Sequence, residues 1–108
     1  LKGSKEEIIE KGEYSKFYMH RIGHWLGMDV HDVGSYKQDG DWRELEKGMV
    51  MTVEPGIYIL DSIEGIDDKW KGIGVRIEDD IAITDSGFEL LTPDVPRTIE
   101  EVEQTVQG

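Results

Sequence analysis

Residues 49–59 read Met-Val-Met-Thr-Val-Glu-Pro-Gly-Ile-Tyr-Ile and carry the strongest structural signal of the chain. Most of these side chains are β-branched, apolar or aromatic, as is usual in strands. Proline lacks the amide hydrogen that a sheet ladder needs, so Pro55-Gly56 predicts a bend between two strands. Glu54 comes just before the bend, where burying an unpaired carboxylate costs free energy. Glu54 therefore either faces water on an edge strand or binds a cation.

A second stretch, residues 75–83, predicts another strand pair or one kinked strand, because apolar residues recur along it. Glu78 in this stretch has the same two interpretations as Glu54. Arg76 is two residues before Glu78, so both side chains project from one face of a continuous strand and can form a salt bridge. Residues 79–80, both aspartate, predict a solvated turn.

The flanking sequence predicts short helices and loops around these strands. Ser4 and Glu7 form a capping-box pattern, which predicts a helix over residues 4–11 that Gly12 ends. Glycines among large apolar residues favour irregular or extended backbone over residues 17–34. The other predicted elements are a loop at 37–42, a polar insertion at 61–72, a turn at 85–87, a short strand at 88–91 and helical turns at 100–107. The fold class is α+β, with mainly antiparallel strands and short helices.

The amino-acid composition limits which binding partners and which cellular location are expected. The 108 residues suit one small domain or a piece of a larger one, and a net charge of −12 argues against nucleic acid or an anionic membrane as partner. The absence of cysteine excludes disulfides and thiolate metal sites. There is no apolar run of the ~18 residues that a membrane span needs, and no secretory signal opens the chain. We therefore expect a cytoplasmic protein.

All three histidines, His20, His24 and His31, fall in one short window. They do not form the zinc motif His-Glu-x-x-His, because Arg21 occupies the glutamate position and Gly23 weakens a helix there. A lone histidine in such a run is usually structural, but imidazoles combined with strand carboxylates are the donors that divalent metals use. From spacing alone, a metal site and structural histidines stay equally open.

Three ordered motifs taken together resemble one family. Residues 17–34, 52–58 and 72–80 are similar to the histidine segment, the Glu-Pro-Gly strand and the last metal-ligand strand of Xaa-Pro aminopeptidases (aminopeptidase P). Residues 91–103 are similar to the ending of that family. The resemblance spans nearly the whole chain. It implies the C-terminal half of a pita-bread fold, which prolidase, creatinase and methionine aminopeptidase share.

The resemblance also implies a metal centre. His24, Glu54 and Glu78 would be metal ligands, and Glu78 would bridge two divalent ions, most often manganese, with zinc or cobalt as alternatives. Two such ions clamp a hydroxide and polarise a scissile carbonyl. Of the other site residues, His31 would contact the substrate or stabilise the tetrahedral intermediate, and His20 would line the substrate pocket. Arg76 would orient ligands or substrate, so that His31 and Arg76 are the catalytic candidates.

The family's site also uses two aspartates from a segment upstream of the histidines. Asp29 and Asp32 lie inside the histidine motif and cannot replace them. Residues 1–108 are therefore expected to be the C-terminal portion of a catalytic domain without its N-terminal half, inactive alone and able to hold at most one metal weakly. Exposed apolar surface then favours association with the missing half and a homo-oligomer.

The expected activity of the parent enzyme is metal-dependent hydrolysis of the N-terminal Xaa-Pro bond of a peptide with proline in second position. The alternatives are a prolidase, which cleaves Xaa-Pro dipeptides, and a non-catalytic pita-bread module that binds peptides or proteins.

Overall fold

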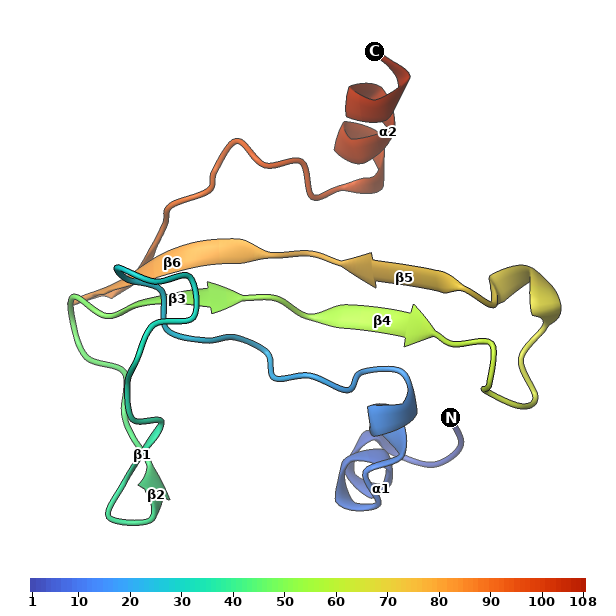
Figure 1. The fold of residues 1–108 in the computed structure, drawn as a ribbon, viewed down its shortest axis with the longest axis horizontal. Helices are drawn as coiled ribbons and strands as arrows, with labels where there is room; N and C mark the ends of the chain where they lie inside the picture. Colours follow the sequence, from blue (N-terminus) through green and yellow to red (C-terminus); the bar gives the residue numbers. More distant parts are fainter. The chain divides into compact units, whose positions relative to one another are not determined.

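The computed structural model describes all residues from Leu1 to Gly108, and Figure 1 shows their helices and strands. The contacts between residues group the chain into two units. We call residues 1–21 and 55–76 the hairpin unit, and residues 22–54 and 77–108 the sheet unit. Short helices and antiparallel strands make up both units, in agreement with the predicted α+β class. No helix is both long enough and apolar enough to cross a membrane.

The hairpin unit begins with the predicted capped helix. In α1, Lys5–Glu10, the backbone N–H of Glu7 donates to Ser4 Oγ, and the Ser4 N–H donates back to the Glu7 carboxylate. Gly12 follows the helix with a φ of 66°, a left-handed conformation that glycine adopts without strain, and the 3₁₀ helix η1, Glu13–Lys16, comes next. The predicted capping box and the glycine stop are confirmed.

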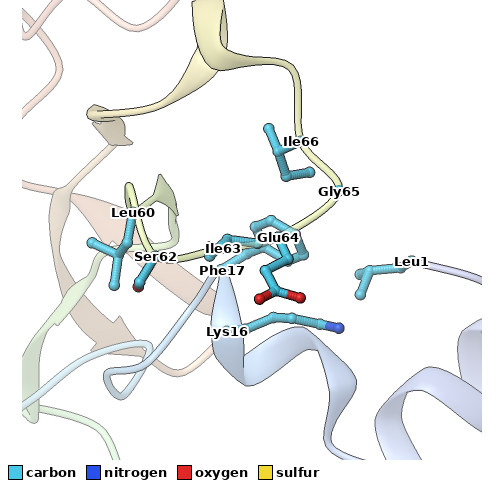
Figure 2. Close-up of a pocket in the computed structure, with 9 residues that line it drawn as sticks. All are labelled: Leu1, Lys16, Phe17, Leu60, Ser62, Ile63, Glu64, Gly65 and Ile66. Carbon is cyan, nitrogen blue, oxygen red and sulfur yellow. The ribbon is translucent and has the colours of Figure 1, made fainter.

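Strand β4, Gly56–Ile59, pairs antiparallel with β5, Ile73–Arg76. The polar insertion between them contains the 3₁₀ helix η2, Asp68–Trp70. This insertion and the N-terminal residues surround a hollow of about 520 Å³, whose lining Figure 2 shows. None of the predicted site residues lines this hollow.

The sheet unit is built on three antiparallel strands in the order β3-β6-β7. These are β3, Val50–Val53; β6, Asp79–Thr84; and β7, Gly87–Leu90. Strand β3 ends one residue before Glu54 and Pro55, which confirms the predicted break in the 49–59 stretch. The predicted turn before the last strand and the C-terminal helix are also present, the latter as α2, Ile99–Gln107.

Two segments differ from the predicted secondary structure, the first for a local reason and the second because of partners distant in the sequence. Residues 37–42 form a small hairpin of β1, Lys37–Gln38, and β2, Asp41–Trp42, instead of a loop. Asp39 and Gly40 have φ values of 54° and 96°, and two positive φ values in sequence are typical of the tight type I′ hairpin turn.

The second error concerns Asp79 and Asp80, which open β6 and do not form a solvated turn. The Asp79 carboxylate accepts hydrogen bonds from Arg97 Nε at 2.7 Å and from Thr92 Oγ1 at 2.8 Å. The hydrogen bonds from Arg97 hold the pKa of Asp79 below its ordinary value. Because Asp79 has these partners, it does not need to face water.

The chain has no fully buried hydrophobic side chain. Large apolar residues such as Ile57 and Val75, which oppose each other in the β4-β5 pair, are exposed. The buried side chains belong instead to Thr52, which is 2% exposed, and Glu54, which is 8% exposed. The most enclosed point of the sheet unit is therefore polar, and it lies at the end of β3.

Candidate metal centre

The register of the β3-β6 pair brings two carboxylates together. Val53 pairs with Asp79, so one further step of the same register places Glu54 opposite Glu78. The next residue, Pro55, has no N–H for a ladder, and the pairing of β3 ends there. Glu54 and Glu78 thus flank the end of a strand pair; they do not lie within strands as the sequence suggested. Arg76 belongs to β5 and Glu78 precedes β6, so the two residues are not on one continuous strand. The prediction that their side chains project from the same face of a strand is therefore wrong.

His24 lies on a segment that runs along the free side of β3. Backbone hydrogen bonds join the N–H of Glu54 to Ile22 O at 2.6 Å, and the N–H of Thr52 to His24 O at 3.0 Å. Trp25 and Met51 form an isolated bridge between the same segments. The prediction of irregular or extended backbone before residue 34 is confirmed, and this segment fixes His24 beside Thr52.

His24, Glu54 and Glu78 form a cluster in which one ligand atom of each lies within 4.8 Å of the others. His24 Nε2 is 3.3 Å from Glu54 Oε1. Because Glu54 is 8% exposed, the interpretation of an edge-strand glutamate facing water is excluded. Glu78 is exposed. An imidazole and two carboxylates with this spacing could hold a divalent cation, which would balance the carboxylate charge.

The orientation of the His24 ring suits a metal ligand. Its Nδ1 lies 3.0 Å from Trp25 O. A carbonyl oxygen can only accept, so Nδ1 donates this hydrogen bond, and Nε2 is the ring nitrogen that faces the cluster and would bind a cation. Metal-binding histidines commonly use their second nitrogen in this way, which fixes the tautomer and the ring orientation.

Thr52 connects two members of the cluster, and sequence reasoning missed it. Its hydroxyl accepts a hydrogen bond from the His24 backbone N–H at 3.0 Å and donates one to Glu54 Oε1 at 3.0 Å. The available signal was its spacing of two residues from Glu54, which places both side chains on one face of the strand.

His31 also lies at the cluster. Its ring packs edge-on against that of His24, with centroids 4.4 Å apart and planes at 74°. The Asp32 N–H donates to Trp25 O at 3.1 Å, so the loop after Trp25 folds back and brings His31 to this place. The structure thus gathers four of the six predicted site residues in the sheet unit.

The other two, His20 and Arg76, meet in the hairpin unit at a residue that the sequence analysis did not select. Arg76 Nε donates to the Tyr58 hydroxyl at 2.7 Å, and this hydroxyl lies 2.8 Å from His20 Nε2. His20 Nδ1 is 2.7 Å from Arg21 O and therefore carries the proton of the neutral ring. Tyr58 then donates to His20, so the hydrogen bonds run in one direction, from Arg76 through Tyr58 and His20 to Arg21 O.

An imidazole and two carboxylates gathered at the end of an antiparallel strand pair define the class of site, a candidate divalent-metal centre. The chain matches the model of metallopeptidase family M24 over residues 4–85, and it belongs to that family.

Individual proteins agree with this assignment. The chain is 54% identical over 103 residues to an Xaa-Pro aminopeptidase of Haemophilus influenzae, an alignment that covers 95% of this chain and 24% of that protein. It is 40% identical over 136 positions to the human Xaa-Pro dipeptidase, covering all of this chain and 27% of that protein. The solved structure of Pseudomonas aeruginosa aminopeptidase PepP superimposes with a TM-score of 0.92 at 56% identity, covering 99% of this chain and 24% of that one.

The resemblance to aminopeptidase P and the pita-bread fold class are therefore confirmed. The chain spans about a quarter of the length of the relatives that it matches.

Proposed function

We propose that the protein to which this chain contributes is a metal-dependent aminopeptidase that removes the first residue from peptides with proline in second position. The observation that carries the proposal is the cluster of His24, Glu54 and Glu78 at the end of the β3-β6 pair. The identity to a protein named Xaa-Pro aminopeptidase supports the choice of substrate.

His24 Nε2 and the carboxylates of Glu54 and Glu78 are the proposed metal ligands. When bound, divalent ions acidify a water molecule and polarise the scissile carbonyl. Manganese is the proposed metal, with zinc or cobalt as alternatives, because one imidazole among hard oxygen ligands suits these ions better than copper. In this proposal the complete centre would hold two such ions, and Glu78 would be among the residues that hold both.

Three protein ligands are too few for two ions. Two aspartates from a preceding segment complete the set in our proposal, and residues 1–108 form the C-terminal portion of the catalytic domain. The exposed apolar pair of Ile57 and Val75 supports this assignment, because such surface is normally covered. This chain alone would hold one ion weakly and be inactive. Cytoplasmic location and homo-oligomeric assembly stay predictions from the sequence.

The remaining residues handle the peptide. His31 is the catalytic candidate at the cluster, where a protonated or neutral ring N–H can stabilise the charge that develops on the substrate carbonyl. His20 lines the pocket, and Arg76 orients the substrate with its positive charge. Tyr58 joins this group because its hydroxyl connects the two side chains.

Two alternatives are less well supported. The alignment with the human dipeptidase runs over 136 positions against the 108 residues of this chain, so it includes inserted sequence that this chain lacks. The aminopeptidase alignment needs only 103 positions. A non-catalytic binding module would have no need of an intact ligand cluster, whereas all three side chains are present.

The test is a peptidase assay of the native protein, meaning the whole protein to which this chain contributes, with Mn²⁺, Zn²⁺ or Co²⁺. The substrates are Xaa-Pro-Yaa tripeptides, Xaa-Pro dipeptides and an Xaa-Ala-Yaa control. We expect cleavage of the tripeptide only, and loss of activity with a chelator. Cleavage restricted to the dipeptide would establish a prolidase. If neither proline peptide is cleaved in the presence of any of the three metals, the enzymatic proposal is wrong.

A further inference from the structure

We infer that Thr52 is a positioning residue that holds His24 and Glu54 in the geometry of a metal site; this rests on the metal-dependent function proposed above. In the proposed function His24 and Glu54 bind a cation. Something else must keep their side chains in position before the cation binds. One hydroxyl group contacts both residues.

The directions of the hydrogen bonds at Thr52 are fixed by chemistry. The His24 backbone N–H can only donate, so the Thr52 oxygen accepts that bond. The hydroxyl has a single proton, and it points to Glu54 Oε1 at 3.0 Å. Both capacities of the hydroxyl are thus used by two proposed ligands, and Glu54 is held as an acceptor.

Burial makes this arrangement hard to replace. Thr52 is 2% exposed and is the only fully buried side chain of the chain. A buried polar group needs a partner, because water cannot reach it to take over a lost hydrogen bond. Removing the Thr52 hydroxyl therefore leaves the His24 N–H without its acceptor and Glu54 without this donor.

The backbone around Thr52 shows that its side chain replaces part of a regular ladder. The Thr52 N–H donates to His24 O, and in a regular antiparallel pair the His24 N–H would donate to Thr52 O in return. It donates to the Thr52 hydroxyl instead. The Thr52 carbonyl lies against Gly23, so close that a Cβ there would be 2.0 Å from the oxygen. The position of His24 therefore depends on a side chain as well as on the ladder.

The substitution Thr52→Val tests this inference because valine has nearly the same shape and lacks the hydroxyl. Thr52→Ser keeps the hydroxyl, and Thr84→Val makes the same chemical change on β6, away from the cluster. For the native protein and each variant, calorimetry measures Mn²⁺ affinity, and the visible absorption of bound Co²⁺ reports the coordination geometry. Circular dichroism verifies folding.

We expect Thr52→Val to bind Mn²⁺ about 10- to 100-fold more weakly, which is the usual loss of affinity when a residue that orients metal ligands is removed. The Co²⁺ spectrum should also change. Thr52→Ser and Thr84→Val should match the native protein within about threefold. If Thr52→Val does not fold, Thr52→Ala replaces it, since it removes the hydroxyl without introducing a bulkier group.

Two results would overturn the inference. Native affinity and an unchanged spectrum in a folded Thr52→Val or Thr52→Ala protein would show that the hydroxyl does not position the ligands. An equal loss in Thr52→Ser would show that packing of the methyl group matters, not the hydroxyl. Failure of the proposed function looks different, because it would be seen in the unsubstituted protein, which would then bind no metal or would not cleave the Xaa-Pro-Yaa tripeptide.

Discussion

His20 and His24 are four residues apart and use the same local arrangement, yet their surroundings give them different partners. Each ring donates from Nδ1 to the carbonyl of the following residue, at 2.7 Å in His20 and 3.0 Å in His24. Each thereby presents Nε2. In His20 that nitrogen accepts from the Tyr58 hydroxyl, whereas in His24 it faces the carboxylate of Glu54. The neighbouring strand, not the local sequence, decides what each histidine can do.

The two histidines also differ in how their partners are supported. Glu54 is buried and is held by a backbone hydrogen bond and by Thr52. The partners of His20 are the side chains of Tyr58 and Arg76, and Arg76 is exposed. In the proposed function His24 is a metal ligand, which needs fixed geometry, whereas His20 lines a substrate pocket, which can adapt. We therefore expect changes near His24 to alter metal binding and changes near His20 to alter catalysis with the metal still bound.

The largest expected effect comes from removing the charge that His24 faces. Glu54→Gln keeps the size of the side chain but loses the anionic donor, so divalent metal affinity should fall by more than about 100-fold, beyond the usual effect of a supporting residue. Calorimetric titration with Mn²⁺ measures this. Glu89→Gln, an exposed position on β7, is the matched control and should bind like the native protein. Equal affinity in the two variants would remove Glu54 from the ligand set.

The next prediction concerns the backbone between the two histidines. A Cβ at Gly23 would lie 2.0 Å from the Thr52 carbonyl oxygen, and a backbone atom of a paired strand cannot easily move away. Gly23→Ala should therefore destabilise the protein by about 1 to 3 kcal/mol in urea unfolding and weaken metal binding.

Gly27→Ala is the control for this prediction. Its Cβ would meet the carboxylate of Asp32, a side chain that can rotate, so the cost should be smaller. If Gly27→Ala were the more damaging variant, the close approach of Gly23 to Thr52 would not be what holds His24.

The third prediction tests the other histidine. Tyr58→Phe removes the hydroxyl that connects Arg76 to His20, and a hydrogen bond to a charged group contributes about 1.5 to 3 kcal/mol. We expect kcat/KM for an Xaa-Pro-Yaa peptide to fall by about tenfold or more while Mn²⁺ affinity stays native. Tyr14→Phe, on the exposed η1 helix, should change neither quantity. A loss of metal affinity in Tyr58→Phe would contradict the division of roles between His20 and His24.

These residues also show what sequence reasoning could reach. The Pro55 break and the Ser4 capping box were predictable because their signals are local and have a single physical cause. His24, Glu54 and Glu78 were grouped from the resemblance of three ordered motifs, and their side chains do lie together; their role as metal ligands stays a proposal. Thr52 was missed, because a threonine in an apolar run is also an ordinary strand residue.

Long-range partners account for the remaining errors. Nothing near Asp79 indicates that Arg97, eighteen residues later, binds its carboxylate. Tyr58 was likewise read only as a strand residue, since its two partners come from separate parts of the chain. The hairpin at 37–42 is a different case, because its Asp-Gly turn was a usable local signal.

The smallest expected effect concerns the carboxylates Glu54 and Glu78, whose surroundings also differ. Glu54 is held directly by Thr52, whereas Glu78 is exposed and its neighbour Asp79 is anchored by Arg97. Arg97→Gln should lower the melting temperature at pH 7 by about 2 to 4 °C, since a small change in stability shifts the transition by a few degrees. The exposed Lys47, which pairs with Asp85, provides the control Lys47→Gln, and this variant should melt like the native protein.

The pH dependence of this effect has a definite sign. Arg97 lowers the pKa of folded Asp79 below the ordinary value of 3.8, so the contribution of the pair to stability is present above that value and is lost as the pH falls through the folded pKa. The difference in melting temperature between native protein and Arg97→Gln should therefore be full at pH 7 and shrink below pH ~3.8. A difference that stays constant into acid would mean that Arg97 stabilises the chain through its packing and its bonds to carbonyl groups, and that the start of β6 is not held by charge.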